Sequence, residues 1–182
     1  VYNKFGYNPS SAHPLGNRSR TFLEDNRKTL LSLLKGSQDA SIIFTSGATE
    51  ANNLAIRGIM KGKQVTKNGY VIASSLEHES ILNLLRHKYN HVLIPCNEKG
   101  YILIDQLEDA IKKFNTQIGL ITIVAAQNEI GTIQDLKHIV PFIRQLTKSY
   151  GTIIHVDACQ LIGKYDISIK NDLDTDFQLY FR

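Results

Sequence analysis

The chain has 182 residues, of which 42% are hydrophobic and 21% are charged. This balance is typical of one globular domain with a sizeable core, and it excludes disordered, collagenous and coiled-coil proteins. No apolar run reaches the ~18 residues of a membrane span, so no membrane association is predicted. The two cysteines, Cys96 and Cys159, are too few for a disulfide framework or a zinc site, and they favour a reducing compartment.

The charge pattern argues against direct binding of nucleic acid. The formal net charge is +4, and the surplus of lysine and arginine lies in the first half of the chain. These residues are scattered, they lack interleaved aromatic residues, and the chain contains no tryptophan. We therefore interpret them as a solvated basic surface. Because the chain begins at Val1 and inside a loop-like stretch, we expect it to be a fragment of a longer protein.

Helical and strand-like patterns alternate along the chain, beginning with a helix over 17–35 and a short buried strand over 41–45. Asp105 is the expected cap of a later helix, and Pro141 lies unfavourably inside another. Continuous apolar strands between helices predict an α/β protein, a three-layer α/β/α fold with a mostly parallel sheet, and we expect residues 1–182 to form one partial domain. The further helices are expected over 48–60, 80–89, 105–114 and 135–150, and the further strands over 70–73, 91–94, 118–124 and 152–156.

Four polar clusters follow predicted strands, and ligands of parallel sheets bind at the carboxyl ends of the strands. The first, residues 45–50, joins a strand to a helix with small residues and the Thr49 hydroxyl, which suits a phosphate. It is not a Walker loop, and an ordinary capped turn has the same composition. The second, residues 77–80, places His78 at a helix start, where an imidazole stacks on a flat ring, moves protons or simply faces solvent.

The third cluster, residues 127–131, contains Asn128, whose amide suits a phenolic or carbonyl oxygen, although asparagine is also common in turns. The fourth, residues 155–160, closes a strand, and alternation places His155 and Asp157 on one face if the strand extends that far. A buried carboxylate requires a cation or hydrogen-bond donors, and a protonated pyridine nitrogen is one such partner. Asp157 is equally compatible with a helix cap.

Taken together, the motifs resemble one family. The chain is similar to the large domain of class V (fold type I) enzymes that depend on pyridoxal 5′-phosphate (PLP), and most similar to the NifS/IscS-like cysteine desulfurases. Any one motif is weakly specific, whereas five motifs in order and at matching spacing are specific. The matching stretches are residues 8–13 with Gly16, 44–56, 77–80, 128–134, and 155–160 with 163–164.

The resemblance implies a role for each matching polar residue. Ala48 and Thr49 would hold the phosphate of PLP. His78 would stack over the pyridine ring and assist proton transfer, which makes it the catalytic candidate of the chain.

The same resemblance places the remaining cofactor contacts around the ring. Asn128 and Gln160 would hydrogen-bond around the ring hydroxyl. Asp157 would pair with the ring nitrogen and keep it protonated, which strengthens the ring as an electron sink.

Two family residues are not found among the 182. The lysine that binds PLP covalently is expected just beyond Arg182, and Phe181 stands where the family has a serine. The cysteine that carries the persulfide belongs to the family's C-terminal half, and neither Cys96 nor Cys159 corresponds to it. We therefore expect these residues by themselves to bind PLP weakly and reversibly, and not to turn over cysteine.

The implied reaction of the parent enzyme removes sulfur from L-cysteine, giving L-alanine and an enzyme persulfide for iron–sulfur cluster assembly or tRNA thiolation. The implied partners are L-cysteine, a second copy of the full-length chain in a homodimer, and an iron–sulfur scaffold or another sulfur acceptor. The implied compartment is the cytoplasm or an organelle. Two alternatives stay open: a truncated, non-catalytic paralogue that acts by binding or dimerising, and another class V activity such as selenocysteine lyase or an aminotransferase.

Overall fold

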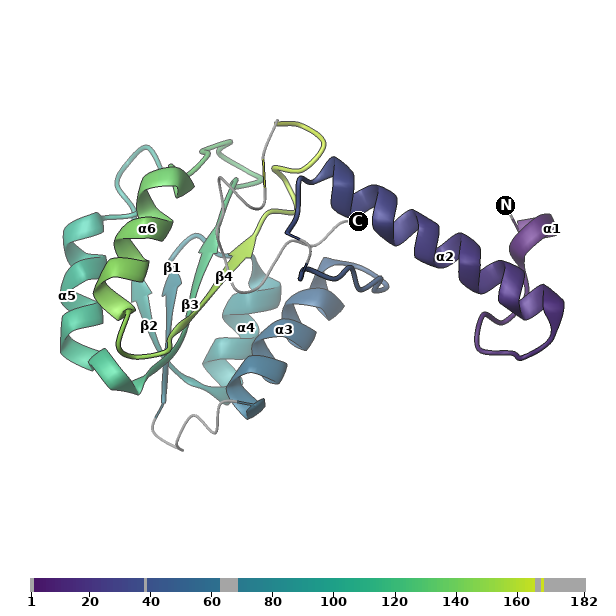
Figure 1. Cartoon of the computed structure of the whole chain (residues 1–182). Helices are drawn as coiled ribbons and strands as arrows, with labels where there is room; N and C mark the ends of the chain where they lie inside the picture. Colours follow the sequence, from purple (N-terminus) through teal and green to yellow (C-terminus); the bar gives the residue numbers. More distant parts are fainter. Residues whose placement is uncertain (1, 38, 63–68, 166–167, 169–182) are drawn as a thin grey trace. The chain divides into compact units, whose positions relative to one another are not determined.

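The computed structural model describes residues 2–37, 39–62, 69–165 and 168 (Figure 1). The chain forms two compact units. The N-terminal unit comprises residues 1–44 with 168–170, and the sheet unit comprises residues 45–167 with 171–182. All six predicted site residues belong to the sheet unit.

The N-terminal unit contains the helices α1 (Tyr2–Phe5) and α2 (Pro14–Leu33). α2 begins before the predicted residue 17, because Pro14 fits the first turn and His13 caps the helix. The Gly16 amide donates to His13 Nδ1 at 3.1 Å. Gly16 itself has no room for a side chain, since a Cβ there would lie 2.5 Å from the carbonyl oxygen of Ser11.

The predicted strand over 41–45 is wrong: these residues form no regular element. Ile43 is 63% exposed and Phe44 is 47% exposed, so the apolar run is not a buried one. A strand is stable only when a neighbour pairs with its backbone, and no strand in the described ranges pairs with this segment. Its Ile42 carbonyl instead accepts from Arg27 Nε at 3.0 Å.

The sheet unit is built on four parallel strands in the order β2-β1-β3-β4, which confirms the predicted parallel sheet. Every residue of β3 is buried, as expected for a strand covered on both faces. β4 ends at Asp157, one residue later than predicted, so the condition for His155 and Asp157 to share a face is met. The strands are β1 (Tyr70–Ser74), β2 (Asn90–Ile94), β3 (Ile118–Val124) and β4 (Ile153–Asp157).

Four helices cover the two faces of this sheet and confirm the three-layer architecture (Figure 1). α3 and α4 pack together on one face, and α5 and α6 pack together on the other. The core beneath α3 and α4 contains Ile56, Val71, Leu85 and Leu120, all without exposed surface. The helices are α3 (Ala48–Gly62), α4 (Glu79–Lys88), α5 (Ile104–Phe114) and α6 (Leu136–Thr147), and the short helix η1 (Asn115–Gln117) follows α5.

Two details of the helices differ from prediction. Asp105 is not a cap: α5 begins at Ile104 after Leu103, whose side chain makes no capping bond, and Asp105 lies in the first turn. A carboxylate there is still favourable, because it faces the positive end of the helix dipole. α6 tolerates Pro141 in its interior but ends at Thr147 rather than residue 150.

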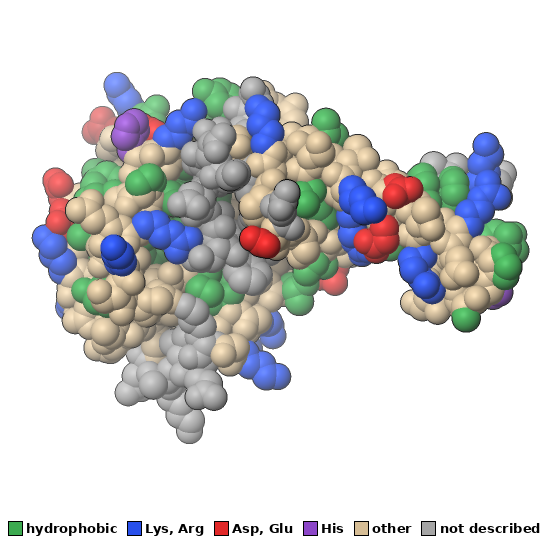
Figure 2. Space-filling view, in the orientation of Figure 1, with side chains coloured by type: hydrophobic (Ala, Val, Ile, Leu, Met, Phe, Trp, Pro, Cys, Tyr) green, Lys and Arg blue, Asp and Glu red, His purple; other side chains and the backbone are tan. Residues whose placement is uncertain are grey.

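The distribution of charged side chains on the surface agrees with the scattered lysine and arginine residues noted in the sequence. Figure 2 shows lysine and arginine side chains spread over the visible face and interspersed with acidic ones. In the described part of the chain, no helix is long and apolar enough to cross a lipid bilayer.

Candidate functional site

The N-terminus of α3 presents unbonded amides at the predicted phosphate site. α3 begins at Ala48, and the first bond of the helix runs from the Ala51 amide to the Gly47 carbonyl at 3.1 Å. The amides of residues 48–50 therefore have no acceptor within the helix and point outward along the axis, where the helix dipole is positive. Thr49 is exposed there, so its hydroxyl is available to the same anion.

A carboxylate already lies at this turn. Glu50 Oε2 accepts from the Ser46 amide at 2.6 Å and from the Ser46 hydroxyl at 2.7 Å. These two hydrogen bonds lower the pKa of the Glu50 carboxyl. The arrangement resembles a capping box and fixes the conformation of the chain as it enters α3.

His78 caps the neighbouring helix α4. Its Nδ1 accepts from the Ser80 amide at 3.1 Å and lies 2.9 Å from the Ser80 hydroxyl. The imidazole is exposed. Its position is therefore set by the backbone of α4 rather than by packing.

Asp157 is a buried carboxylate at the carboxyl end of β4, with 5% of its surface exposed. Its Oδ1 accepts from the Cys159 amide at 3.0 Å, and its Oδ2 accepts from Asn52 Nδ2 at 2.9 Å. Among the residues that the structure describes, no lysine or arginine forms an ion pair with it. The Asp157 carboxylate therefore accepts a cap-like hydrogen bond from the Cys159 amide and can still accept further hydrogen bonds.

Asn52 joins these elements. Its Nδ2 donates both to Asp157 and, at 3.0 Å, to the Ser80 hydroxyl, which contacts His78. Three segments distant in sequence, the second turn of α3, the start of α4 and the end of β4, therefore meet through side-chain hydrogen bonds. Thr49 lies three residues before Asn52, which is about 4.5 Å along a helix axis.

Asn128 and Gln160 both follow strand ends but lie on exposed turns. The turn at Asn128 is shaped by Gln127, whose Oε1 accepts from the amides of Glu129 and Ile130. Gln160 Oε1 accepts from Lys164. In the part of the chain that the structure describes, neither residue hydrogen-bonds to His78 or Asp157, so the structure does not bring these two into the group.

Three titratable groups around Asp157 have strongly shifted pKa values. Burial raises the pKa of the Glu77 carboxyl well above its ordinary value, and the charge of Asp157 raises it further. Burial lowers the pKa of His155, against the opposing effect of Asp157. Burial and the charge of Asp157 together raise the pKa of the Cys159 thiol far above its ordinary value. Burial is the largest cause of all three shifts, and the negative charge at Asp157 is the second cause in each.

Residue-by-residue interpretation of the sequence missed Asn52 and Ser80. Asn52 does carry a signal, because it stands at helical spacing from Ala55, Ile56 and Ile59 on a buried face. A polar residue on such a face needs a partner, which here is Asp157. Ser80 gives no comparable signal, since serine is common in the first turn of any helix.

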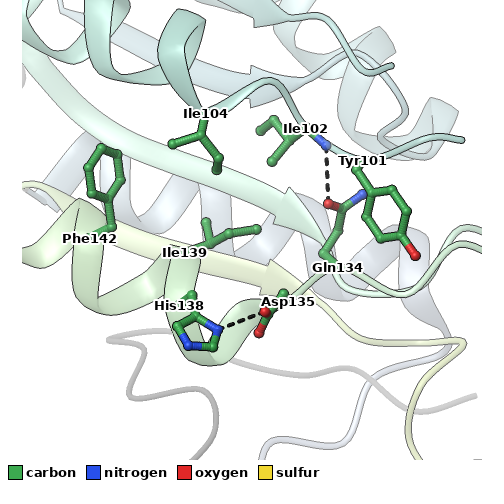
Figure 3. A pocket seen from close by; sticks show the side chains of 8 residues that line it. All are labelled: Tyr101, Ile102, Ile104, Gln134, Asp135, His138, Ile139 and Phe142. Carbon is green, nitrogen blue, oxygen red and sulfur yellow. Dashed lines mark hydrogen bonds and ion pairs between the residues drawn. The ribbon is translucent and has the colours of Figure 1, made fainter. Parts of the chain in front are cut away.

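A separate pocket of about 320 Å³ lies between α5 and α6 (Figure 3). None of the six predicted site residues lines it, and most of its walls are apolar. At one side His138 Nδ1 lies within hydrogen-bond distance of Asp135 Oδ2, at 2.7 Å. Its lining residues are Tyr101, Ile102, Ile104, Gln134, Asp135, His138, Ile139 and Phe142.

Comparison with known proteins agrees with the geometry. The family model described as aminotransferase class-V matches residues 1–181. The cysteine desulfurase IscS of Dictyoglomus turgidum is 34% identical over 170 residues, which are 91% of this chain and 41% of that protein. The mitochondrial cysteine desulfurase of Candida maltosa is 34% identical over 176 residues, covering 94% of this chain and 34% of that protein.

A solved structure of a NifS-like protein matches with a TM-score of 0.88 and 28% identity, over 99% of this chain and 48% of that one. The chain thus spans less than half the length of the relatives it matches. The match to the family model extends over nearly every residue, and three of the four polar clusters lie where the sheet's strands end, while the first lies at the start of α3. The chain belongs to the class V aminotransferase family.

Proposed function

We propose that this chain is the cofactor-binding part of a PLP-dependent cysteine desulfurase, which removes sulfur from L-cysteine and leaves L-alanine. Enzymes of the class V family depend on PLP, and the relatives reported above are named as cysteine desulfurases. Because the chain matches only part of their length, the activity of the whole protein is a proposal. Residues 1–182 would form part of one large domain of that enzyme.

Asp157 is the observation that carries this proposal. A carboxylate with 5% exposure costs free energy unless donors or a cation compensate it. Asn52 and the Cys159 amide supply one donor to each oxygen, and each oxygen retains acceptor capacity. A protonated pyridine nitrogen is a donor and a cation at once, so it fits this carboxylate.

The other proposed contacts to PLP come from polar groups at the same edge of the sheet. The outward amides at the start of α3 and the Thr49 hydroxyl would hold the phosphate, with Ala48 in the same turn. His78 would cover the ring face and move protons, and Asn128 and Gln160 would reach the ring hydroxyl from the exposed turns. Bound PLP supplies the electron sink that makes the bonds of the attached amino acid labile.

Cys159 is unsuited to receive the sulfur. A sulfur acceptor must be a thiolate, and burial beside Asp157 keeps the Cys159 thiol protonated by raising its pKa. The acceptor of the proposed reaction is therefore a different cysteine. The further partners of the proposal are a second copy in a homodimer and an iron–sulfur scaffold or another sulfur acceptor, in the cytoplasm or an organelle.

The test uses pyridoxine 5′-phosphate, which lacks the aldehyde and binds only non-covalently. We expect the 182-residue chain to bind it saturably and to bind unphosphorylated pyridoxine more weakly. The near-ultraviolet absorbance of the ring reports the protonation of its nitrogen, which should persist to higher pH when bound. Asp157→Asn should weaken binding by about tenfold or more and abolish this persistence.

Asp135→Asn is the matched control, because Asp135 is an exposed carboxylate at the start of another helix. It should leave both binding and absorbance unchanged. Absence of saturable binding, or equal effects of the two substitutions, would overturn the assignment of Asp157.

A further inference from the structure

The hydrogen bonds around Asn52 have a defined direction. Asn52 has no exposed surface, and its Nδ2 lies 2.9 Å from Asp157 Oδ2 and 3.0 Å from Ser80 Oγ. Turning the amide over would place Oδ1 against the carboxylate, with two acceptors in contact, so the amide nitrogen is the donor in both bonds. The buried Oδ1 then has no hydrogen-bond partner among the described residues. In this orientation the amide nitrogen of Asn52 bonds the Asp157 carboxylate, while the amide oxygen is left without a bond among the described residues.

Ser80 continues the donor-to-acceptor order of these hydrogen bonds from Asn52 to the His78 imidazole. Its hydroxyl accepts from Asn52, so its own proton is available to His78 Nδ1 at 2.9 Å. The Ser80 amide donates to the same Nδ1 at 3.1 Å. Nδ1 is therefore an acceptor, and in the neutral ring the proton is on Nε2.

We propose that Asn52 and Ser80 are positioning residues that hold the Asp157 carboxylate and the His78 ring in one hydrogen-bonded arrangement. Because Asn52 orients the Ser80 hydroxyl, the hydrogen bonding of His78 Nδ1 then depends on Asn52. What this arrangement would do for bound PLP rests on the proposed function. The pyridine nitrogen of PLP would meet Asp157, and His78 would present Nε2–H for proton transfer. The arrangement itself is a property of the chain without any ligand.

The first test observes His78 directly, by ¹⁵N NMR of the histidine-labelled chain, with the resonance assigned by a His78→Gln variant. Ser80→Ala keeps the backbone cap but removes the hydroxyl, so the Nδ1 resonance should shift toward that of an imidazole nitrogen without a hydrogen bond. Ser80→Thr restores the hydroxyl and should restore the resonance. A residue with a purely structural role would change stability without moving this resonance.

The second test concerns Asn52. Asn52→Leu should also shift His78 Nδ1, because the Ser80 hydroxyl loses the donor that orients it. Asn53→Leu is the matched control: Asn53 is the next residue of α3, and its Nδ2 bonds the Thr49 carbonyl at 2.9 Å instead. It should leave His78 unchanged. If Ser80→Ala leaves Nδ1 unmoved, or if the two leucine variants shift it equally, the inference is wrong.

A ligand experiment separates this inference from the proposed function. Pyridoxine 5′-phosphate and benzyl phosphate share a phosphate, but only the first has a ring nitrogen. We expect the wild-type chain to prefer pyridoxine 5′-phosphate and Asn52→Leu to reduce that preference about tenfold, with benzyl phosphate binding unchanged. A wild-type chain without any preference would contradict the proposed function, while the NMR result would still decide the positioning role. An intact preference in Asn52→Leu would contradict the positioning of Asp157.

Discussion

Thr122 Oγ1 and His155 Nδ1 lie 2.8 Å apart on the adjacent strands β3 and β4, where the register of the sheet pairs the two residues. His155 has no exposed surface, and burial lowers the pKa of its imidazole to about 4. The ring is therefore neutral in the folded chain at pH 7. This pair links the centre of the sheet to the strand that carries Asp157.

Acidification should destabilise the chain through His155. The unfolded imidazole titrates near 6.5 and the folded one near 4, so the unfolded chain binds the proton first. The contribution is fully present above pH 6.5 and is lost as the pH falls toward 4, on the order of 2–3 kcal/mol. Urea unfolding between pH 4 and 8 measures it. His155→Asn should flatten the dependence, whereas His87→Asn, at an exposed histidine, should not.

Glu77→Gln should stabilise the chain at neutral pH. The pKa of Glu77 is raised above its ordinary 4.5 in the fold, so the unfolded chain loses its proton first as the pH rises. Stability therefore falls from pH 4.5 up to the folded pKa, and glutamine removes that loss. The gain should be measurable at pH 7 and should vanish below pH 4.5. A gain of equal size from Glu98→Gln, at an exposed position, would contradict this explanation.

Cys159 should react slowly with iodoacetamide at pH 8. Alkylation requires the thiolate, and burial beside Asp157 keeps the pKa of this thiol far above its ordinary value. We expect the rate to be at least about tenfold below that of the same residue in the urea-unfolded chain, because the thiolate fraction falls tenfold for each pKa unit. Peptide mass spectrometry against time separates Cys159 from Cys96. Equal rates for Cys159 in the folded and unfolded chains would show that its environment has no such effect.

Gln134→Leu should destabilise the chain by about 2–3 kcal/mol. Gln134 is buried, its Nε2 donates to the Gly100 carbonyl at 2.7 Å, and its Oε1 accepts from the Ile102 amide at 3.2 Å. Leucine has a similar volume but leaves both backbone groups without their partner. Chemical denaturation measures the loss, and Gln106→Leu on the exposed side of α5 provides the comparison. A loss confined to Gln106→Leu would contradict the argument.

The sequence predicted the sheet well and the N-terminal segment poorly, for one physical reason. β3 is a mostly apolar run in which every residue is buried, so local composition and tertiary environment agree. The segment at Ile43 and Phe44 has the same local composition but lacks a pairing strand in the described ranges. Strand formation depends on a neighbour that composition does not reveal.

Sequence motifs indicate single residues of the candidate site but not the hydrogen-bond network that joins them. His78 and Asp157 stand out because one follows β1 and the other ends β4, and because both side chains can bind or move a proton. The bond from Asn52 to Asp157 joins residues that are 105 positions apart, and only the packing of α3 on β4 creates it. The positions of Asn128 and Gln160 relative to a ligand stay a prediction, since both lie on exposed turns.

The bond between Glu50 and Ser46 gives the start of α3 a resident anion. The positive end of the helix already faces a carboxylate, which occupies the Ser46 amide and hydroxyl. A phosphate at this turn would therefore meet a partly neutralised dipole and a nearby like charge, although the amides of residues 48–50 stay outside the two bonds to Glu50. The attraction of this helix end for an anion is thus the difference between the pull of the dipole and the repulsion by Glu50.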